Sequence, residues 1–287
     1  MRVRGQPRSG PAAPEHGRPV FMTRKTRLDA ELIRRGLARS REQAGELIAA
    51  GRVAVAGQQA GKAATQVGQE SAITVRDGDA PPEYASRGGR KLAGALAAFT
   101  GLVVAGRRCL DAGASTGGFT DVLLRHGAAH VVAVDVGYGQ LAWLLRTDPR
   151  VTVLDRVNVR GLLPEQVAPA PGLVTADLSF ISVRLVLPAL ARCAAPAADF
   201  VLMIKPQFEV GKGNVGAGGV VRDPQLRLDA VAAVAAAAAD HGLGALGVTA
   251  SPLPGPAGNV EYFLWLRRGA PPLDPAALQL AIAEGPQ

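Results

Sequence analysis

The segment Leu110-Asp111-Ala112-Gly113-Ala114-Ser115-Thr116-Gly117-Gly118-Phe119-Thr120 runs from an apolar strand through a glycine-rich turn into a helix. Glycines let the backbone approach a ligand closely, and the N-terminus of the following helix is partly positive. Such a turn is typical of α/β domains that hold an adenosine-type cofactor. The residues expected to contact this cofactor are Gly113, Ser115, Thr116, Gly117 and Gly118.

Strand-like and helix-like stretches alternate around this turn. The expected helices centre on residues 120, 143, 187 and 230. The expected strands are 108–112, 131–136, 151–154, 173–177, 200–204, 244–250 and 262–267. This alternation predicts a doubly wound, mostly parallel α/β sheet whose last two strands form a terminal hairpin. We expect the domain to span residues 84–268, with 269–287 as a short tail.

An acidic residue supports the assignment of a cofactor site. Asp135 ends the second expected strand, 22 residues after Gly113, at a position that typically binds ribose hydroxyls. Ser115 replaces the second glycine of the dinucleotide pattern G-x-G-x-x-G, which favours S-adenosylmethionine, a cofactor without pyrophosphate, over NAD. Asp155 and Asn158 are candidates to bind the adenine amine, with a polar turn cap as the alternative reading.

Two charged residues follow apolar strands directly. Asp177 ends the fourth expected strand and Lys205 the fifth, and open α/β sheets bind ligands at these strand ends. A lysine there is costly unless paired, so it forms a structural ion pair or takes part in chemistry. The nearby cofactor turn favours chemistry. With Lys91 and Glu261, these residues form a set suited to removing a proton from a weakly acidic hydroxyl.

Residues 22–76 show a different pattern, with helices expected over 26–36 and 40–51 and short strands over 52–57 and 72–75. This segment has ten basic and five acidic residues, so its net charge of +5 makes up over half of the chain's +8. Such a concentration of positive charge favours RNA as the partner over a merely solvated helix surface. The candidate phosphate-binding residues are Arg27, Arg34, Arg39, Arg41 and Arg52, together with Arg87 and Arg90 beside Lys91.

The remaining features narrow the class of protein. Residues 1–21 lack the apolar core of a secretory signal and are expected to be a disordered extension, and 77–83 is a turn-rich linker. Cys109 and Cys193 are expected to be buried apolar residues, so neither a metal site nor a disulfide is predicted. No stretch approaches the roughly 20 apolar residues that span a bilayer, and a cytoplasmic protein is expected. The oligomeric state is left open.

Five segments resemble motifs of the TlyA family, which joins an S-four-type RNA-binding domain to an FtsJ/RrmJ-like methyltransferase domain. They are 86–92, 111–120, 177–182, 205–209 and 258–263, and residues 26–76 resemble the S-four-type domain. The resemblance implies a Rossmann-like methyltransferase, preceded by a small α+β domain, that methylates cytidine ribose 2′-hydroxyls in 16S and/or 23S ribosomal RNA. Its partners would be ribosomal RNA or ribosomal subunits.

The resemblance also implies a Lys-Asp-Lys-Glu catalytic tetrad at Lys91, Asp177, Lys205 and Glu261, and places Asp177 beside the cofactor. Lys205 is then expected to be the general base and Lys91 a cation that positions the substrate. Two alternative functions are an NAD-dependent oxidoreductase and a non-enzymatic RNA-binding or haemolysin-like protein.

Overall fold

The computed structural model describes residues 25–38, 41–49, 51–68, 70–76, 84–255 and 257–285. These described residues divide into two compact units, one within 1–51 and 60–71 and the other within 52–59 and 72–287. The expected extension 1–21, the linker 77–83 and the candidate Arg39 lie outside the described residues. The domain limits 22–76 and 84–268 stay predictions, because strands expected in the smaller domain group with the second unit.

The first unit contains helices α1 (Leu28–Arg34) and α2 (Arg41–Ala49) and an antiparallel pair of strands, β1 (Thr26–Arg27) and β4 (Gln66–Val67). Leu28, Leu32 and Ile48 are buried. Glu31 is also buried, and two hydrogen bonds from Arg34 with a third from Arg35 lower the pKa of its carboxyl to about 2. The unit therefore combines a small apolar core with a compensated buried charge.

Three short strands of the second unit form a separate antiparallel sheet in the order β3-β2-β5. They are β2 (Val53–Val55), β3 (Gln58–Gln59) and β5 (Ile73–Val75). The two strands expected over 52–57 and 72–75 are thus confirmed, each slightly shorter than expected.

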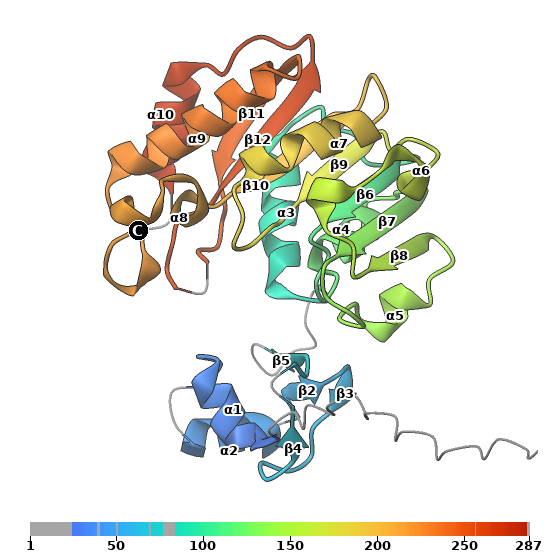
Figure 1. The fold of residues 1–287 in the computed structure, drawn as a ribbon, viewed down its shortest axis with the longest axis vertical. Coiled ribbons are helices and arrows are strands. Elements are labelled where there is room, and N and C mark those ends of the chain that lie inside the picture. The colour runs from blue at the N-terminus through green and yellow to red at the C-terminus, as the bar shows by residue number, and fades with distance from the viewer. Residues whose placement is uncertain are drawn as a thin grey trace, which may run out of the picture. The chain divides into compact units, whose positions relative to one another are not determined.

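The main sheet has seven strands in the order β11-β12-β10-β9-β6-β7-β8. Its strands are β6 (Arg108–Ala112), β7 (His130–Asp135), β8 (Val151–Asp155), β9 (Leu173–Ala176), β10 (Asp199–Ile204), β11 (Leu243–Ala250) and β12 (Tyr262–Arg268). All neighbours are parallel except β12, which is antiparallel to both β10 and β11. The Rossmann-like α/β class is therefore confirmed, and the terminal hairpin inserts its second strand next to β10 (Figure 1).

Alternate side chains of the buried strands point into two apolar layers, one on each face of the sheet. One face packs against α3 (Arg87–Ala98), α4 (Gly118–Arg125) and α5 (Trp143–Arg146). The other packs against α6 (Pro164–Val167), α7 (Leu187–Cys193), α9 (Pro224–Ala239) and α10 (Pro275–Glu284). A single turn, α8 (Pro206–Glu209), follows β10 directly.

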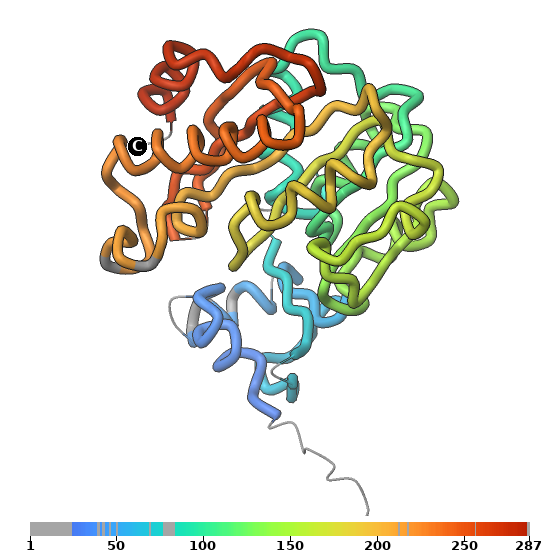
Figure 2. The backbone as a smooth tube through the Cα atoms, turned by 45° about the horizontal axis from the view of Figure 1, so that its top comes forward, coloured from blue at the N-terminus to red at the C-terminus, as the bar shows by residue number. Residues whose placement is uncertain are grey.

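The stretch expected to be a short tail, 269–287, contains helix α10. Asp274 caps this helix by accepting a hydrogen bond from the backbone of Ala276, and Leu278 and Ile282 are buried in the apolar layer. Figure 2 shows α10 beside α9. The expectation of a tail is therefore wrong for residues 275–284, because their apolar side chains complete the core over β11.

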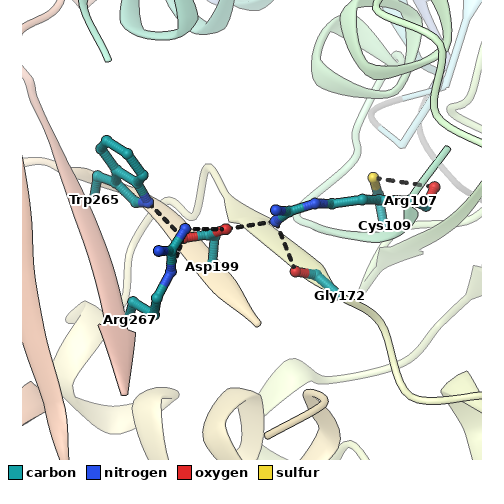
Figure 3. A network of polar contacts seen from close by, with 6 residues as sticks. All are labelled: Arg107, Cys109, Gly172, Asp199, Trp265 and Arg267. Atoms are coloured by element: carbon teal, nitrogen blue, oxygen red, sulfur yellow. Dashed lines mark hydrogen bonds and ion pairs between the residues drawn. The ribbon is translucent and has the colours of Figure 1, made fainter. Parts of the chain in front are cut away.

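A buried carboxylate ties four strands together at the edge opposite the cofactor turn (Figure 3). Asp199, at the start of β10, accepts hydrogen bonds from Arg107, Trp265 and Arg267, and Arg107 also donates to the carbonyl of Gly172 ahead of β9. Burial alone would raise the pKa of Asp199, but these donors outweigh it and lower the pKa. The fully partnered charge of Asp199 thus fixes this end of the strands.

Cys109 and Cys193 are both free and buried, as expected, and burial raises the pKa of the Cys109 thiol to about 12. Among the residues that the structure describes, no helix has the length and apolar character to span a bilayer.

Candidate active site

The glycine turn lies against the carboxyl end of β9. Gly113 has φ +90°, and a Cβ atom at this position would collide with the carbonyl oxygen of Asp177. The backbone amide of Asp177 in turn donates to Ala112 (3.0 Å). Gly113 is therefore required both by its left-handed conformation and by this close approach, which brings the turn and Asp177 together.

The second half of the turn opens helix α4. Gly117 precedes the helix with φ +99°, and a Cβ atom there would collide with the side chains of Leu145 and Leu141. A Cβ atom on Gly118 would lie 2.8 Å from the backbone nitrogen of Gly89 in α3. These glycines let α4 begin directly beneath the turn, with its N-terminal amides at the edge of the sheet.

Asp135 organises the rim on the other side. Its carboxylate accepts hydrogen bonds from the backbone amides of Ser115 (2.8 Å) and Gly137 (2.7 Å). Ser115 itself adopts a left-handed conformation with φ +47°. Each carboxylate oxygen retains a further lone pair, so Asp135 is oriented to accept hydrogen bonds from ribose hydroxyls.

The two candidates for the adenine amine differ in their surroundings. Asp155 accepts hydrogen bonds from Arg146 (3.0 Å) and from the backbone of Gly139 (3.3 Å), so it lies on the rim next to the segment that follows Asp135. Asn158 caps the short turn Val159–Gly161 by accepting from the backbone of Arg160. The position of Asp155 supports it as a cofactor-binding residue. Asn158 instead caps a turn, which was the alternative reading for these two residues.

The four tetrad residues form two ion pairs, in which Lys91, Glu261 and Lys205 are buried and Asp177 is partly buried. Lys205 lies 2.6 Å from Asp177, and Lys91, on α3, lies 2.5 Å from Glu261. The lysines are 9% and 7% exposed, respectively. Because Ile204 and Tyr262 are partners across β10 and β12, Lys205 and Glu261 flank the same position of the sheet. A Cβ atom on Gly88 would lie 3.8 Å from Asp177, so the first turn of α3 also reaches the Asp177 carboxylate. The structure thus gathers all four residues at one edge of the sheet.

A fifth carboxyl group lies below the glycine turn. Asp111 is fully buried on β6, and its Oδ2 accepts a hydrogen bond from Thr120 (2.7 Å). In the part of the chain that the structure describes, Oδ1 of Asp111 has no hydrogen-bond partner. The pKa of Asp111 is raised to about 7, mainly by burial and in smaller part by the neighbouring negative charge of Asp177. The sequence pattern places Asp111 on the strand before the glycine turn and predicts no separate role for it.

Two more residues were not among the sequence-based candidates. Ser179 accepts a hydrogen bond from Lys205 (2.9 Å), and Glu209, the last residue of α8, accepts several from the loop after β9. Both lie inside segments that were singled out for their resemblance to family motifs. No composition or spacing signal separates them from their neighbours, because their roles depend on the path of the loop.

A glycine-rich loop after α8 is hydrogen-bonded to the segment that carries Glu261, just before β12. Asn259, which is 2% exposed, donates to the carbonyl of Gly219 (2.8 Å) and accepts from the backbone of Val221 (2.9 Å). The loop carries two short turns, Lys212–Asn214 and Ala217–Gly219. Asn259 therefore anchors one end of this loop two residues before Glu261.

The candidate RNA-binding arginines make varied contacts. Arg27 pairs with Asp29, Arg34 pairs with Glu31, and the side chain of Arg52 donates to the carbonyl of Arg76. The side chain of Arg41 is exposed at the start of α2. Arg87 and Arg90 lie in the first turns of α3 beside Lys91. These assignments remain predictions.

These features fit S-adenosylmethionine. The turn leaves bare backbone where a Cβ atom would intrude, the rim carries an oriented carboxylate, and the tetrad adjoins both. The residues that would hold the cofactor are Gly113, Ser115, Thr116, Gly117, Gly118, Asp135, Asp155 and Asp177. Among the described residues, no group of histidine, cysteine and acidic side chains is arranged to hold a metal ion.

Comparisons with known proteins give the same picture. The profile of the FtsJ-like methyltransferases matches residues 84–268, and that of the S4 domain matches residues 26–73. The match to a methyltransferase family disfavours the NAD-dependent alternative.

Curated relatives and a solved structure cover nearly the whole chain. A 16S/23S rRNA (cytidine-2′-O)-methyltransferase, TlyA, of Mycobacterium tuberculosis is 61% identical over 271 residues, covering 92% of this chain and 100% of the relative. A putative rRNA methyltransferase of Bacillus subtilis, YqxC, is 42% identical, covering 85% and 86%. The structure of a putative hemolysin from Streptococcus thermophilus has a TM-score of 0.74 at 37% identity, covering 91% of this chain and 96% of that one. This chain belongs to the FtsJ-like methyltransferases and, within them, to the TlyA family.

Proposed function

We propose that this protein methylates the ribose 2′-hydroxyl of a cytidine in 16S and/or 23S ribosomal RNA, with S-adenosylmethionine as the methyl donor. The observation that carries the proposal is the two lysine–carboxylate ion pairs beside the glycine turn, Lys205 with Asp177 and Lys91 with Glu261. The 61% identity to an rRNA (cytidine-2′-O)-methyltransferase supports the choice of substrate. A non-enzymatic RNA-binding or haemolysin-like function does not account for these pairs.

The bound cofactor supplies an electrophilic methyl group on a sulfonium, which is a good leaving group. The nucleophile is the difficulty, because a ribose hydroxyl does not ionise appreciably at neutral pH. A neutral amine at Lys205 accepts the hydroxyl proton as the oxygen attacks the methyl carbon in line. The carbon–sulfur electron pair goes to sulfur, and Lys205 becomes an ammonium that pairs with Asp177.

Lys91 has a different role. Its amine lies on α3 and is held by Glu261, which is 1% exposed, so it presents a fixed positive charge beside the reacting groups. We assign it to positioning the substrate, with Arg87 and Arg90 of the same helix binding neighbouring phosphates. The N-terminal unit supplies further phosphate contacts through Arg27, Arg34 and Arg41, and Arg52, the first residue of the second unit, supplies another. We also propose that the protein acts in the cytoplasm, where it would meet ribosomal RNA.

The test maps 2′-O-methylation on ribosomal RNA from a strain that lacks the protein, before and after the wild-type protein is added back. We expect at least one cytidine to lose its methyl group and regain it. If wild-type protein restores no 2′-O-methyl group on either ribosomal RNA, the proposed function is wrong.

Two variants at position 205 separate a base from a structural ion pair. Lys205→Arg keeps a cation next to Asp177, but a guanidinium does not deprotonate in proteins. We expect both Lys205→Arg and Lys205→Ala to lose methyl transfer by about 10²–10⁴-fold while they still bind S-adenosylhomocysteine. Near wild-type activity of a folded Lys205→Arg protein would show that Lys205 is not the base.

A further inference from the structure

We propose that Ser179 is a positioning residue that aims the lone pair of the Lys205 amine at the ribose hydroxyl, and that Glu209 holds Ser179 in place. This inference rests on the proposed function, because it concerns the direction from which Lys205 receives the proton. It assigns roles to two residues that lie outside the tetrad.

The first step of the argument is the geometry of the amine. Lys205 Nζ donates a hydrogen bond to Ser179 Oγ at 2.9 Å and forms an ion pair with Asp177 Oδ1 at 2.6 Å, an oxygen that has no hydrogen-bond partner among the described residues. A neutral amine has two N–H bonds and one lone pair in a tetrahedral arrangement around nitrogen. The Ser179 hydroxyl fixes one N–H bond, and the Asp177 carboxylate at 2.6 Å repels the lone pair, so the lone pair is turned away from both groups. With Asp177 alone, the amine could turn about the Cε–Nζ bond and the lone pair would sweep over a cone.

The second step is the position of Ser179 itself. It lies in the loop between β9 and the short turn Val183–Leu185, and the next residue, Phe180, adopts a left-handed conformation with φ +64°. Such a conformation in a bulky residue is unfavourable and persists only where surrounding contacts enforce it. The loop must therefore be held from outside.

Glu209 supplies this hold. Its buried carboxylate accepts hydrogen bonds from Ser182 Oγ (2.5 Å), from the backbone of Val183 (2.7 Å) and from Arg184 Nε (3.2 Å). Arg184 also donates to the backbone carbonyl of Glu209 (3.0 Å). Four contacts thus connect one residue of α8 to three consecutive residues of the loop.

The third step joins the two anchors. Lys205 is the N-cap of α8 and Glu209 is its last residue, so the base and the residue that holds the loop lie at opposite ends of one helical turn. Phe208, also on α8, packs its ring against Phe180, with 5.3 Å between the ring centroids. The distance between Lys205 and Ser179 is therefore set by a short rigid element, and small displacements of a reacting group are expensive in rate.

The test compares Ser179→Ala with Ser179→Thr, which keeps a hydroxyl, in single-turnover methyl transfer by the full-length protein. We expect Ser179→Ala to lower the rate constant at saturating RNA and cofactor by about 10–100-fold. KM for RNA and the dissociation constant of S-adenosylhomocysteine should stay within about twofold of wild type, and Ser179→Thr should recover most of the rate. Thr152→Val is the matched control, since it removes a hydroxyl that contacts His130 elsewhere on the sheet.

Glu209→Gln should lower the same rate constant, and its effect should not multiply with that of Ser179→Ala, because both act through the direction of one amine. Unchanged kinetics in a folded Ser179→Ala protein, or a loss that appears equally in S-adenosylhomocysteine binding, would overturn the inference. Lys205→Arg in the same assay keeps the two proposals apart. If it is inactive while Ser179→Ala is not, the positioning role alone is wrong, and if it is active, the base assignment is wrong.

Discussion

At the scale of single residues, Gly113 joins the cofactor turn to the catalytic edge. Gly113→Ala places a methyl group against the carbonyl oxygen of Asp177 in a backbone conformation with φ +90°. Because that carbonyl belongs to the strand end that carries Asp177, the turn or the strand must shift. We expect a loss of about 2–4 kcal/mol in the free energy of unfolding and at least a tenfold weaker S-adenosylhomocysteine affinity, measured by denaturation and calorimetry.

Gly106→Ala is the control for Gly113. Gly106 has a similar conformation, φ +74°, but nothing lies within 4 Å of the position that a Cβ atom would take. Backbone strain alone should cost about 1 kcal/mol and leave cofactor affinity unchanged. Equal effects of the two variants would mean that the approach to Asp177 does not matter.

Asp111 should make stability depend on pH. Its folded-state pKa of about 7 lies above the ordinary value of 3.8, mainly because of burial. Folding therefore favours the protonated form, and the resulting stabilisation is complete below about pH 4 and lost as the pH rises to about 7. The full shift corresponds to a change on the order of 4 kcal/mol.

Asp111→Asn, which cannot titrate, isolates this effect. The free energy of unfolding of the wild type, relative to this variant, should fall between pH 4 and pH 7 and then level off, in denaturant titrations at several pH values. A difference between the two proteins that does not vary with pH would contradict the buried, protonated state of Asp111.

Some of these residues and their properties could be predicted from the sequence, and others could not. Asp135 and Lys205 could be identified because each follows an apolar strand, and strand ends in an α/β sheet share one edge. The raised pKa of Asp111 could not be predicted from the sequence, because it depends on which side of β6 is covered by α4. Ser179 and Glu209 could not be identified because their contact with the base depends on a loop conformation that no periodicity describes.

At the scale of elements, α10 offers a direct comparison within one helix. Leu278 is 3% exposed and belongs to the apolar layer, whereas Leu280 is 58% exposed. Leu278→Ala should lower the free energy of unfolding by about 2–4 kcal/mol, because it leaves a cavity over β11. Leu280→Ala should change it by less than about 0.5 kcal/mol. Equal effects in denaturant unfolding would mean that α10 is not part of the core.

The same helix shows why some elements are harder to predict than others. The strands of the main sheet are short apolar runs bounded by turns, and both observed limits of each strand lie within one residue of the predicted ones. Helix α10 is apolar on several sides and follows two prolines, so its sequence lacks the alternation of an amphipathic helix. The place of β12 between β10 and β11 is a matter of sheet order, which local sequence does not carry.

At the scale of the whole molecule, the two ends of the parallel strands differ in the partners of their charged side chains. At one edge, Asp199 is surrounded by donors and fastens four strands. At the other, lysines and carboxylates are paired one to one, and Asp111 keeps an oxygen without a partner in the described residues. Strand ends whose charged groups are all partnered stabilise the fold. Strand ends with polar atoms that still lack a hydrogen-bond partner can bind a substrate.

The charge of the whole chain, +8, should make ribosomal binding depend on salt, and the arginines of the first unit should carry part of that dependence. Arg34→Ala with Arg41→Ala is the sharpest test. Glu31 keeps Arg35 when Arg34 is removed, whereas removing Arg27 would take both of its side-chain hydrogen bonds from Asp29. If both arginines contact phosphate, the slope of log affinity against log salt should decrease in magnitude by about 1–2 for binding to ribosomal subunits.

Arg150→Ala with Arg268→Ala changes the net charge of the chain by the same amount, at residues that adjoin the opposite edge of the main sheet, where β8 begins and β12 ends. A general effect of net charge would weaken binding equally in both double variants. Contacts through the first unit would reduce the salt slope only when Arg34 and Arg41 are replaced. Methyl-transfer rates at saturating RNA should be unchanged in both, because none of these arginines takes part in the proposed chemistry. A defect confined to affinity would then assign the first unit to binding and the second to chemistry.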